Sequence, residues 1–348
     1  MIISDSINIY LKTTETCNLN CDHCFTSGSK GKKIYFNSIK TFSFIDKLFS
    51  SKEFRSKRLL FHGGEPMLAP MKDITGFYDL VLSKYPETEF TIQTNLVYPL
   101  TEEKLDVLNL FQDIGTSWDL DMRFANPRQI LLWEDNVREL IRRKHNVSVM
   151  VSINSALVYK MEPGDLIQYF IDLGIQHVLF ERITSNGNAV LNPEIQPQNK
   201  DLDAWLLKMY EQTMERELYK YIHNMFLDEV ATSFVNRMHV ANRCRNCEQS
   251  LLTINADGTI AGCPNSAPEE FWGNIEWSVE DNLKSKKRIK TMACEMKRND
   301  NCLTCPVNNI CNGDCHRLPW QGDICAAPKS LMIKMQNENK VEDYRRLL

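Results

Sequence analysis

The sequence predicts an α/β fold with a parallel sheet, followed by a smaller cysteine-rich module. Two features indicate the sheet: six segments rich in β-branched residues alternate with segments of helical periodicity, and each pair is long enough for a crossover connection. The cysteines indicate the second module. Of twelve cysteines, three lie at 17–24, nine at 244–325 and none between. The 348 residues suffice for one large and one smaller domain.

The first elements have the clearest patterns. Residues 7–13 (INIYLKT) alternate in polarity, as a half-buried strand does, and residues 36–50 repeat apolar side chains at helical spacing. Residues 58–66 (RLLFHGGEP) form a short apolar run that ends in a Gly–Gly turn. The helix that begins at Met71 stops before Pro86.

The same alternation continues along the chain. Thr101 is a typical N-cap for the next helix, which runs to about 111. Further strands are expected over 89–95, 114–121, 147–154 and 177–183, and further helices over 129–144 and 163–173. A long helical stretch at 200–240 is expected to link the two modules, and the last twenty residues to form a closing helix.

Polar residues follow the predicted strands directly. In parallel α/β sheets the functional groups gather at the carboxyl ends of the strands. The residues expected at this edge are Cys17, Gly63–Glu65, Gln93–Asn95, Ser117–Asp119, Ser152–Asn154 and Arg182.

Composition and charge argue against a nucleic-acid-binding, a membrane-spanning or a secreted protein. The net charge of −4 gives no reason to expect nucleic acid as a partner. No apolar run is long enough to span a membrane, and the first twelve residues do not resemble a signal peptide. We therefore expect a cytoplasmic protein. In a reducing cytoplasm, clustered cysteines are metal ligands or redox centres more often than disulfides.

The segment TCNLNCDHCF places Cys17, Cys21 and Cys24 on one short loop. Three thiolates cannot complete a tetrahedral zinc site without a distant fourth ligand. They can hold three irons of a four-iron cluster and leave the fourth iron open for a substrate or cofactor. A chance zinc site or free thiols are the alternatives.

The spacing C-x3-C-x2-C, with His23 before the last cysteine, resembles the signature of radical S-adenosylmethionine (SAM) enzymes. GGEP at 63–66 resembles the methionine-binding turn of that family. The resemblance implies a partial (β/α)6 TIM-like barrel, a [4Fe-4S] cluster, and SAM cleaved to a 5′-deoxyadenosyl radical that abstracts hydrogen. It further implies that Glu65 accepts from the SAM ammonium and that Arg182 or Arg123 pairs with the carboxylate. The implied cofactor-binding set is His23, Gly63, Gly64, Glu65, Pro66, Gln93, Asn95, Ser117, Asp119 and Arg182.

The C-terminal cysteines resemble the SPASM extension of radical SAM peptide maturases, which carries two auxiliary four-iron clusters. The resemblance implies one auxiliary cluster on Cys244, Cys247, Cys263 and Cys315. It implies the other on Cys302, Cys305, Cys311 and Cys325. Cys294 is left over and is expected to be a structural thiol. Zinc, or clusters with a purely structural role, are the alternatives. The expected domains are a radical SAM barrel at 1–235, a SPASM domain at 236–328 and a C-terminal helix at 329–348.

These resemblances imply an enzyme that oxidatively modifies a ribosomally made precursor peptide, with an electron donor such as flavodoxin or ferredoxin. The segments CNLNCDHCFTSG and ERITSNGNA resemble the corresponding segments of maturases that form three-residue cyclophanes. These enzymes join an aromatic ring to a side-chain β-carbon. Asp119, Asp121 and Glu181 are the candidate bases. The base is otherwise open, as are the peptide, its binding site and the oligomeric state.

Three other functions are weighed against this one. Sulfatase maturases form formylglycine with an aspartate directly after the third auxiliary cysteine, where this chain has Pro264. Many thioether-forming maturases carry a leader-binding domain of about eighty residues before the first cysteine motif, and only sixteen residues precede Cys17. A non-enzymatic iron–sulfur electron carrier would need neither the GGEP turn nor an open iron.

Overall fold

The computed structural model describes residues 3–26 and 28–348 of the chain. Residues 1–2 lie outside the described residues. They include Met1, where the predicted first domain begins, and the start of the twelve-residue segment that does not resemble a signal peptide. Within the described residues, no helix is both long and apolar enough to span a membrane.

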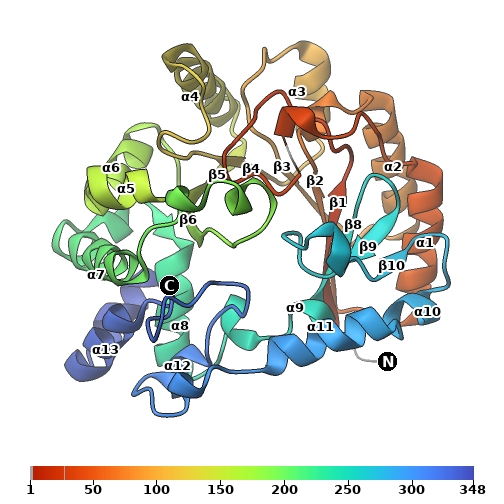
Figure 1. The fold of residues 1–348 in the computed structure, drawn as a ribbon. Coiled ribbons are helices and arrows are strands. Elements are labelled where there is room, and N and C mark those ends of the chain that lie inside the picture. The colour runs from red at the N-terminus through yellow and green to blue at the C-terminus, as the bar shows by residue number, and fades with distance from the viewer. Residues whose placement is uncertain (1–2, 27) are drawn as a thin grey trace.

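A ten-stranded sheet in the order β10-β9-β8-β1-β2-β3-β4-β5-β6-β7 forms the centre of the molecule. Strands β8 and β1 to β7 pair in parallel, whereas β9 and β10 add on as antiparallel strands. Figure 1 shows β1 to β6 as a curved row with helices on its outer side. The strands are β1 Ser6–Lys12, β2 Ser56–His62, β3 Glu89–Gln93, β4 Asp113–Ser117, β5 Asn146–Ile153, β6 His177–Arg182, β7 His223–Asn224, β8 Leu251–Ile254, β9 Thr259–Ala261 and β10 Gly273–Asn274. This confirms the predicted α/β class with a parallel sheet.

Helices connect the strands and cover the outer face of the curved sheet (Figure 1). The first group is α1 Ser38–Ser51, α2 Met71–Lys84, α3 Glu102–Leu108, α4 Pro127–Arg142, α5 Ser155–Lys160, α6 Pro163–Asp172, α7 Asn199–Glu215 and α8 Met225–Val235. The C-terminal group is α9 Cys247–Ser250, α10 Val279–Leu283, α11 Lys286–Met296, α12 Asn308–Cys311, α13 Lys329–Glu338 and α14 Val341–Tyr344. In Figure 1 the blue C-terminal segment lies opposite the row of β2 to β5.

Local sequence explains where the main helices begin. Thr101 accepts a hydrogen bond from the backbone of Lys104 and caps α3, as predicted. Asn37 and Asn126 cap α1 and α4 in the same way. In β1, one set of alternate side chains (Ile7, Ile9, Leu11) is completely buried and supplies part of the core.

Several predicted elements differ from those observed. β4 ends at Ser117 rather than 121, and Asp119, which lies beyond the strand, pairs with Arg123. The stretch at 200–240 is not continuous: Glu217 adopts φ 54°, and β7 separates α7 from α8. The closing helix also breaks, because Asn339 has a left-handed φ of 49°.

Three strands that the sequence does not predict extend the sheet beyond β1. Leu251–Ile254 pairs in parallel with β1, and β9 and β10 continue outward from it. These strands have only two to four residues each, too few to produce a recognisable period. The sheet thus continues past α8, where the predicted boundary at 235 falls.

Candidate functional site

The three-cysteine loop follows β1 at the carboxyl edge of the sheet. Cys21 is buried and Cys17 and Cys24 are half-buried. Backbone amides donate to two of the sulfurs: Leu19 N lies 3.4 Å from Cys17 Sγ and Gly28 N lies 3.2 Å from Cys24 Sγ. Such donors are typical around iron–sulfur ligands, where they stabilise the thiolate. Without a metal, burial raises the pKa of Cys17 to about 12 and that of Cys21 to about 11.

The GGEP turn is in direct contact with this loop. Gly64 N donates to Thr14 O and Glu65 N donates to Thr16 O, each at 2.8 Å. A Cβ on Gly63 would lie 2.4 Å from Thr14 O, and Gly63 has a φ of +144°. A Cβ on Gly64 would lie 2.1 Å from Thr16 O. Only glycine permits this approach of two backbones, so the turn and the cysteine loop form one unit.

Glu65 is completely buried, and Pro66 follows it at the start of a short 3₁₀ helix. Its carboxylate accepts from Asn95 N at 2.7 Å, from Thr94 Oγ1 at 2.7 Å and from Met67 N at 3.0 Å. The carboxylate fastens the end of β3 to the GGEP turn. That Glu65 accepts from the SAM ammonium stays a prediction.

The predicted residues on β3 and β4 are brought together at the same edge. Gln93 Nε2 donates to Ser117 Oγ at 2.9 Å. Asn95 donates to Asn18 Oδ1 at 2.7 Å and lies 3.6 Å from Cys17 Sγ. Asn95 therefore contacts the cysteine loop itself.

A buried ion pair between Asp119 and Arg123 lies next to His23 of the cysteine loop. Asp119 Oδ2 accepts from Arg123 Nε at 2.6 Å, and Oδ1 accepts from Ser152 N at 2.7 Å. Burial alone would raise the pKa of Asp119, but the Arg123 guanidinium keeps that pKa below its usual range. His23 Nε2 lies 3.8 Å from the same carboxylate and 3.3 Å from Ser152 Oγ, and burial lowers the His23 pKa to about 4. His23 Nδ1 is buried without a partner in the described residues.

Two other predicted site residues lie elsewhere. Arg182 is buried and forms a bidentate ion pair with Asp314, at 2.7 and 3.0 Å, so its guanidinium faces the C-terminal module. Asp121 is exposed and pairs with Lys160 at 2.7 Å. Their proposed roles in binding SAM and as a base stay predictions. Glu181 remains a candidate base on β6, and burial raises its pKa.

One of the two predicted auxiliary sites coincides with a cavity. A cavity of about 120 Å³ is lined by all four of its cysteines, Cys302, Cys305, Cys311 and Cys325. These cysteines come from three separate segments between 302 and 325, so folding rather than chain proximity brings them together. Four thiols that line one cavity fit a polynuclear cluster.

The other predicted set is partly assembled. Burial raises the pKa of Cys247, and the nearby Cys263 and Cys315 raise it further; Cys315 also raises the pKa of Cys263, after burial. Cys244 differs from these three. Its Sγ donates to His239 O at 2.7 Å. Burial raises the pKa of Cys244, Arg243 lowers it and Glu229 raises it. All twelve cysteines, which all lie in the described part of the chain, are unpaired.

Cys294 is exposed on α11. The expectation that it is a structural thiol is corrected, since an exposed side chain packs no core. In the described residues, no three His, Cys, Asp or Glu side chains converge closely enough to hold a single metal ion.

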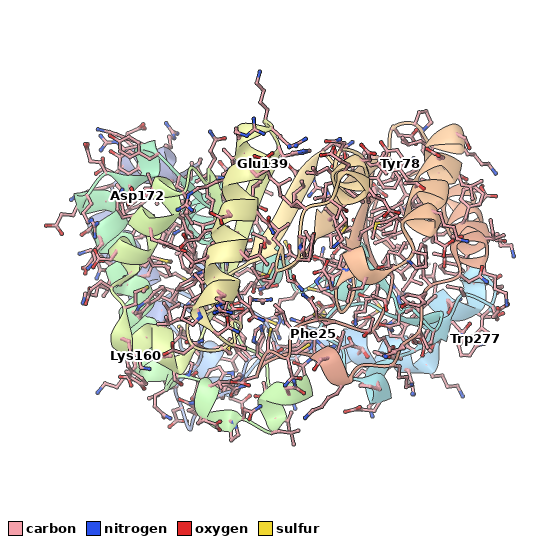
Figure 2. The ribbon with its side chains drawn as sticks, turned by 90° about the horizontal axis from the view of Figure 1, so that it is seen from above. Phe25, Tyr78, Glu139, Lys160, Asp172 and Trp277 are labelled. Atoms are coloured by element: carbon pink, nitrogen blue, oxygen red, sulfur yellow. The ribbon has the colours of Figure 1, made fainter. Side chains whose placement is uncertain are left out.

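Sequence reasoning missed two contributors to the site. Asn188 holds the cysteine loop from the segment after β6, with its backbone N donating to Cys24 O at 2.9 Å and its side chain to Cys21 O at 3.0 Å. Lys12 ends β1 and is only 3% exposed. A charged residue at the end of an apolar strand was a visible signal for Lys12. The Asn188 contacts depend on tertiary structure and have no local signal. Figure 2 shows Phe25, which follows Cys24, near the middle of the molecule, whereas Lys160 and Trp277 lie at its periphery.

The chain resembles known proteins in sequence. Residues 11–160 match the model of the radical SAM superfamily, a span that includes the three-cysteine loop and the GGEP turn. MJ0907 of Methanocaldococcus jannaschii is 26% identical over 301 residues, which cover 82% of this chain and 94% of that protein. A protein of Archaeoglobus fulgidus is 20% identical over 327 residues, covering 88% and 73%.

Solved structures share the fold. The structure of anSMEcpe with bound AdoMet and Cp18Cys peptide superposes with a TM-score of 0.77 at 16% identity and covers 98% of both chains. Streptococcus suis SuiB bound to the precursor peptide SuiA gives a TM-score of 0.62 at 14% identity, covering 90% of this chain and 72% of that one. Residues 11–160 are thus similar to the radical SAM superfamily, and almost the whole chain shares the fold of these solved structures.

Proposed function

We propose that this radical SAM protein oxidatively modifies a ribosomally made peptide, and that it does so by joining an aromatic ring to a nearby side-chain β-carbon. The observation that carries the proposal is the combination of two kinds of cysteine site in one fold. One loop offers three thiols next to a glycine turn, and the C-terminal module offers a cavity lined by four.

The cysteine loop and its neighbours fit a [4Fe-4S] cluster with SAM. When bound, this pair supplies a carbon-centred radical that removes a hydrogen atom from the substrate. Cys17, Cys21 and Cys24 would hold three irons. The backbone of Gly63 and Gly64, which has no Cβ in the way, would line the methionine end of SAM, and Pro66 would complete the turn.

The remaining residues would orient this centre. Gln93 and Ser117, linked at 2.9 Å, present polar groups at the edge where SAM would lie. Asp119 would hold the loop through His23, a loop residue whose Nε2 lies 3.8 Å from the carboxylate that Arg123 holds in place. Asp119 is therefore a positioning residue in this proposal, and Glu181 is the candidate base that remains.

The reaction is proposed to be oxidative because the C-terminal module offers two further cysteine sets. Crosslinking removes two hydrogens from the peptide: one hydrogen atom goes to the SAM-derived radical, and the second is lost as a proton and an electron. A cluster ligated by four cysteines has no open iron for substrate but can accept that electron. We propose a radical SAM domain over 1–235, an auxiliary-cluster domain over 236–328 and a C-terminal helix over 329–348. A flavodoxin or ferredoxin would supply the electron that starts the reaction.

A peptide substrate is supported by the bound peptides in both similar structures, Cp18Cys in anSMEcpe and SuiA in SuiB. The cyclophane subtype rests on the resemblance of the segments at 17–28 and 181–189 to cyclophane-forming maturases. Formylglycine formation is the second candidate, since it would use the same three cysteine sets. Its weak point is Pro264, which stands directly after Cys263 where that reaction uses an aspartate.

The test is co-expression of the protein with each short peptide encoded beside its gene, followed by mass spectrometry. A loss of about two mass units that resists thiol alkylation, with fragments missing inside a ring around an aromatic residue, supports the crosslink. A two-unit loss on Cys or Ser that reacts with hydrazines supports formylglycine instead. Cys21→Ala is the negative control, because it removes one ligand of the open-iron cluster; a product that persists in this variant contradicts a radical SAM mechanism.

A further inference from the structure

We propose that the solvent-facing side of α11 is the docking surface of an acidic one-electron carrier of the flavodoxin or ferredoxin class. The carrier would take up the electron that leaves the peptide during crosslinking. The inference rests on the proposed function and deepens it, because only a redox reaction needs such a partner. It gives a role to the basic helix Lys286–Met296, which none of the proposed reaction steps uses.

Helix α11 is inverted relative to an ordinary amphipathic surface helix, which turns its apolar side chains inward. Here the inward side carries two charged residues, Arg288 and Glu295, which are at most 2% exposed. Ile289 and Met296 are instead 55% and 59% exposed. Two adjacent stripes of exposed side chains, called the α11 face below, follow from the helical repeat. The apolar stripe is Ile289, Ala293 and Met296, and the basic stripe is Lys286, Lys290 and Lys297.

The charge of the α11 face is positive and local. Between Lys284 and Arg298 the only acidic residue is Glu295, which is buried on the inward side of the helix. Glu280, which precedes the segment, already pairs with Lys284. The chain as a whole carries a net charge of −4, so an acidic protein would be attracted to this face rather than to the surface in general. A basic stripe beside an apolar one is complementary to an acidic protein with an apolar contact patch.

The inward side of α11 contacts residues of both predicted auxiliary sites. Glu295 Oε1 accepts from Cys247 N at 2.6 Å, and Cys247 belongs to the first of these sites. Just after the helix, Arg298 Nη2 donates to Asn312 Oδ1 at 2.8 Å, and Asn312 follows Cys311 of the second site. A helix with its side chains is about 10–12 Å across. A partner on the α11 face would therefore be one helix away from the backbone that carries a proposed cluster ligand.

The position of α11 along the sheet favours an electron carrier over the substrate peptide as the occupant. Ser4 N, at the start of β1, donates to Gln249 O of α9 at 2.7 Å, and Leu251 of β8 pairs with Asn8. Helix α9, which α11 contacts through Glu295, therefore lies at the amino edge of the sheet. Figure 1 shows α11 near the N-terminus, away from the red segment that follows β1. The peptide has to react beside the cysteine loop at the carboxyl edge, whereas a carrier needs to reach only an auxiliary site.

The electron balance of the proposed reaction requires such a carrier. After the SAM-derived radical has taken one hydrogen atom, formation of the carbon–carbon bond releases one proton and one electron from the peptide. The proton goes to solvent. The electron would pass through an auxiliary site to the oxidised carrier, which is thereby reduced by one electron and leaves the enzyme ready for another turnover.

The experiment is calorimetric titration of the reconstituted holoenzyme with the oxidised flavodoxins and ferredoxins encoded in the same genome. At least one carrier should bind the wild type, with an affinity that falls as salt is added. The combined variant Lys286→Gln, Lys290→Gln and Lys297→Gln should raise the dissociation constant about tenfold, because it removes three exposed charges from the contact. The same three positions changed to arginine should stay near the wild type.

The matched control is the combined variant Lys30→Gln, Lys32→Gln and Lys33→Gln. It removes the same charge from another exposed basic segment, which follows the cysteine loop at the opposite edge of the sheet. This variant should bind the carrier as the wild type does. A loss of affinity in the control alone would place the carrier beside the cysteine loop, and equal losses in both variants would show a general charge effect. Either result would overturn the inference, as would a wild type that binds none of the carriers.

Cys294 gives a second readout, because it is exposed on α11 and belongs to neither auxiliary ligand set. A saturating concentration of the carrier should slow the alkylation of Cys294 by a maleimide, measured by mass spectrometry of the digested holoenzyme. An unchanged rate at saturation would overturn the inference. A peptide that stays unmodified, while carrier binding still depends on the α11 face, would contradict the proposed crosslinking and support the docking surface.

Discussion

Arg182 and Asp314 form a buried bidentate ion pair that joins the end of β6 to the loop between Cys311 and Cys315. Arg182 Nη1 and Nη2 donate to the two carboxylate oxygens at 2.7 and 3.0 Å, and both side chains are at most 4% exposed. Asp314 Oδ1 also accepts from Cys315 N at 2.6 Å. Because Cys311 and Cys315 belong to different predicted clusters, this single pair fixes the position of both relative to the sheet.

The first prediction concerns this pair. Asp314→Asn should lower the free energy of unfolding by about 3–5 kcal/mol, because it leaves the Arg182 charge buried and uncompensated. Urea unfolding measures the loss. The exposed pair between Arg58 and Glu89, whose side chains are 47% and 52% exposed, is the control, and Arg58→Met should cost at most about 1 kcal/mol. Equal effects of the two substitutions would show that the buried pair has no special role.

Most of the barrel could be predicted from the sequence because its signals are local. The alternation in 147–154 and the cap at Thr101 are visible in a few consecutive residues, and the corresponding elements, β5 and α3, form as expected. The same holds for the cysteine loop and the glycine turn, whose residue types are dictated by ligand chemistry and by backbone contact.

What could not be predicted depends on distant parts of the chain. Arg182 stands at the expected strand end, but its partner Asp314 is 132 positions away, so nothing near Arg182 distinguishes a cofactor contact from an internal ion pair. The hydrogen bonds of Glu65 are hidden from the sequence for the same reason, since its donors Thr94 and Asn95 at the end of β3 lie some 30 residues on. Strand β8 is only four residues long and becomes a strand because β1 offers it an unpaired edge.

The second prediction tests the cysteine sets by iron content. Cys21→Ala should lose about four irons per chain and all SAM cleavage, since the open-iron cluster loses a ligand. Cys311→Ala should also lose about four irons but retain cleavage of SAM in the absence of peptide. Cys294→Ala should match the wild type in both, because Cys294 is exposed and outside the three sets. Iron analysis and chromatography of 5′-deoxyadenosine give the two readouts. Iron loss in Cys294→Ala would contradict the proposed ligand sets.

The third prediction concerns the contact between the glycine turn and the cysteine loop. Gly63→Ala should abolish SAM binding, because the new Cβ would lie 2.4 Å from Thr14 O and the φ of +144° is strained for alanine. Gly76→Ala is the control within α2, where no atom lies within 4 Å of the added Cβ; it should stabilise the protein by about 0.5–1 kcal/mol. Calorimetric titration with SAM measures binding. Normal affinity in a folded Gly63→Ala protein would show that the backbone contact is dispensable.

The fourth prediction is a pH dependence of stability that originates at His62. Burial, followed by the positive charge of Lys12, lowers the pKa of His62 to about 4, and Nδ1 accepts from Gly63 N at 2.8 Å, which requires the neutral ring. Above about pH 6.5 the ring is neutral in both the folded and the unfolded chain, so its contribution is constant. As the pH falls from 6.5 toward 4, only the unfolded chain takes up the proton, and stability is lost. Relative to wild type, His62→Gln should therefore lose about 1–2 kcal/mol less between pH 7 and pH 5, measured by urea unfolding at both values. Parallel curves for the two proteins would mean that His62 titrates normally in the folded chain and that the pocket between Tyr10 and Phe25 is open to water.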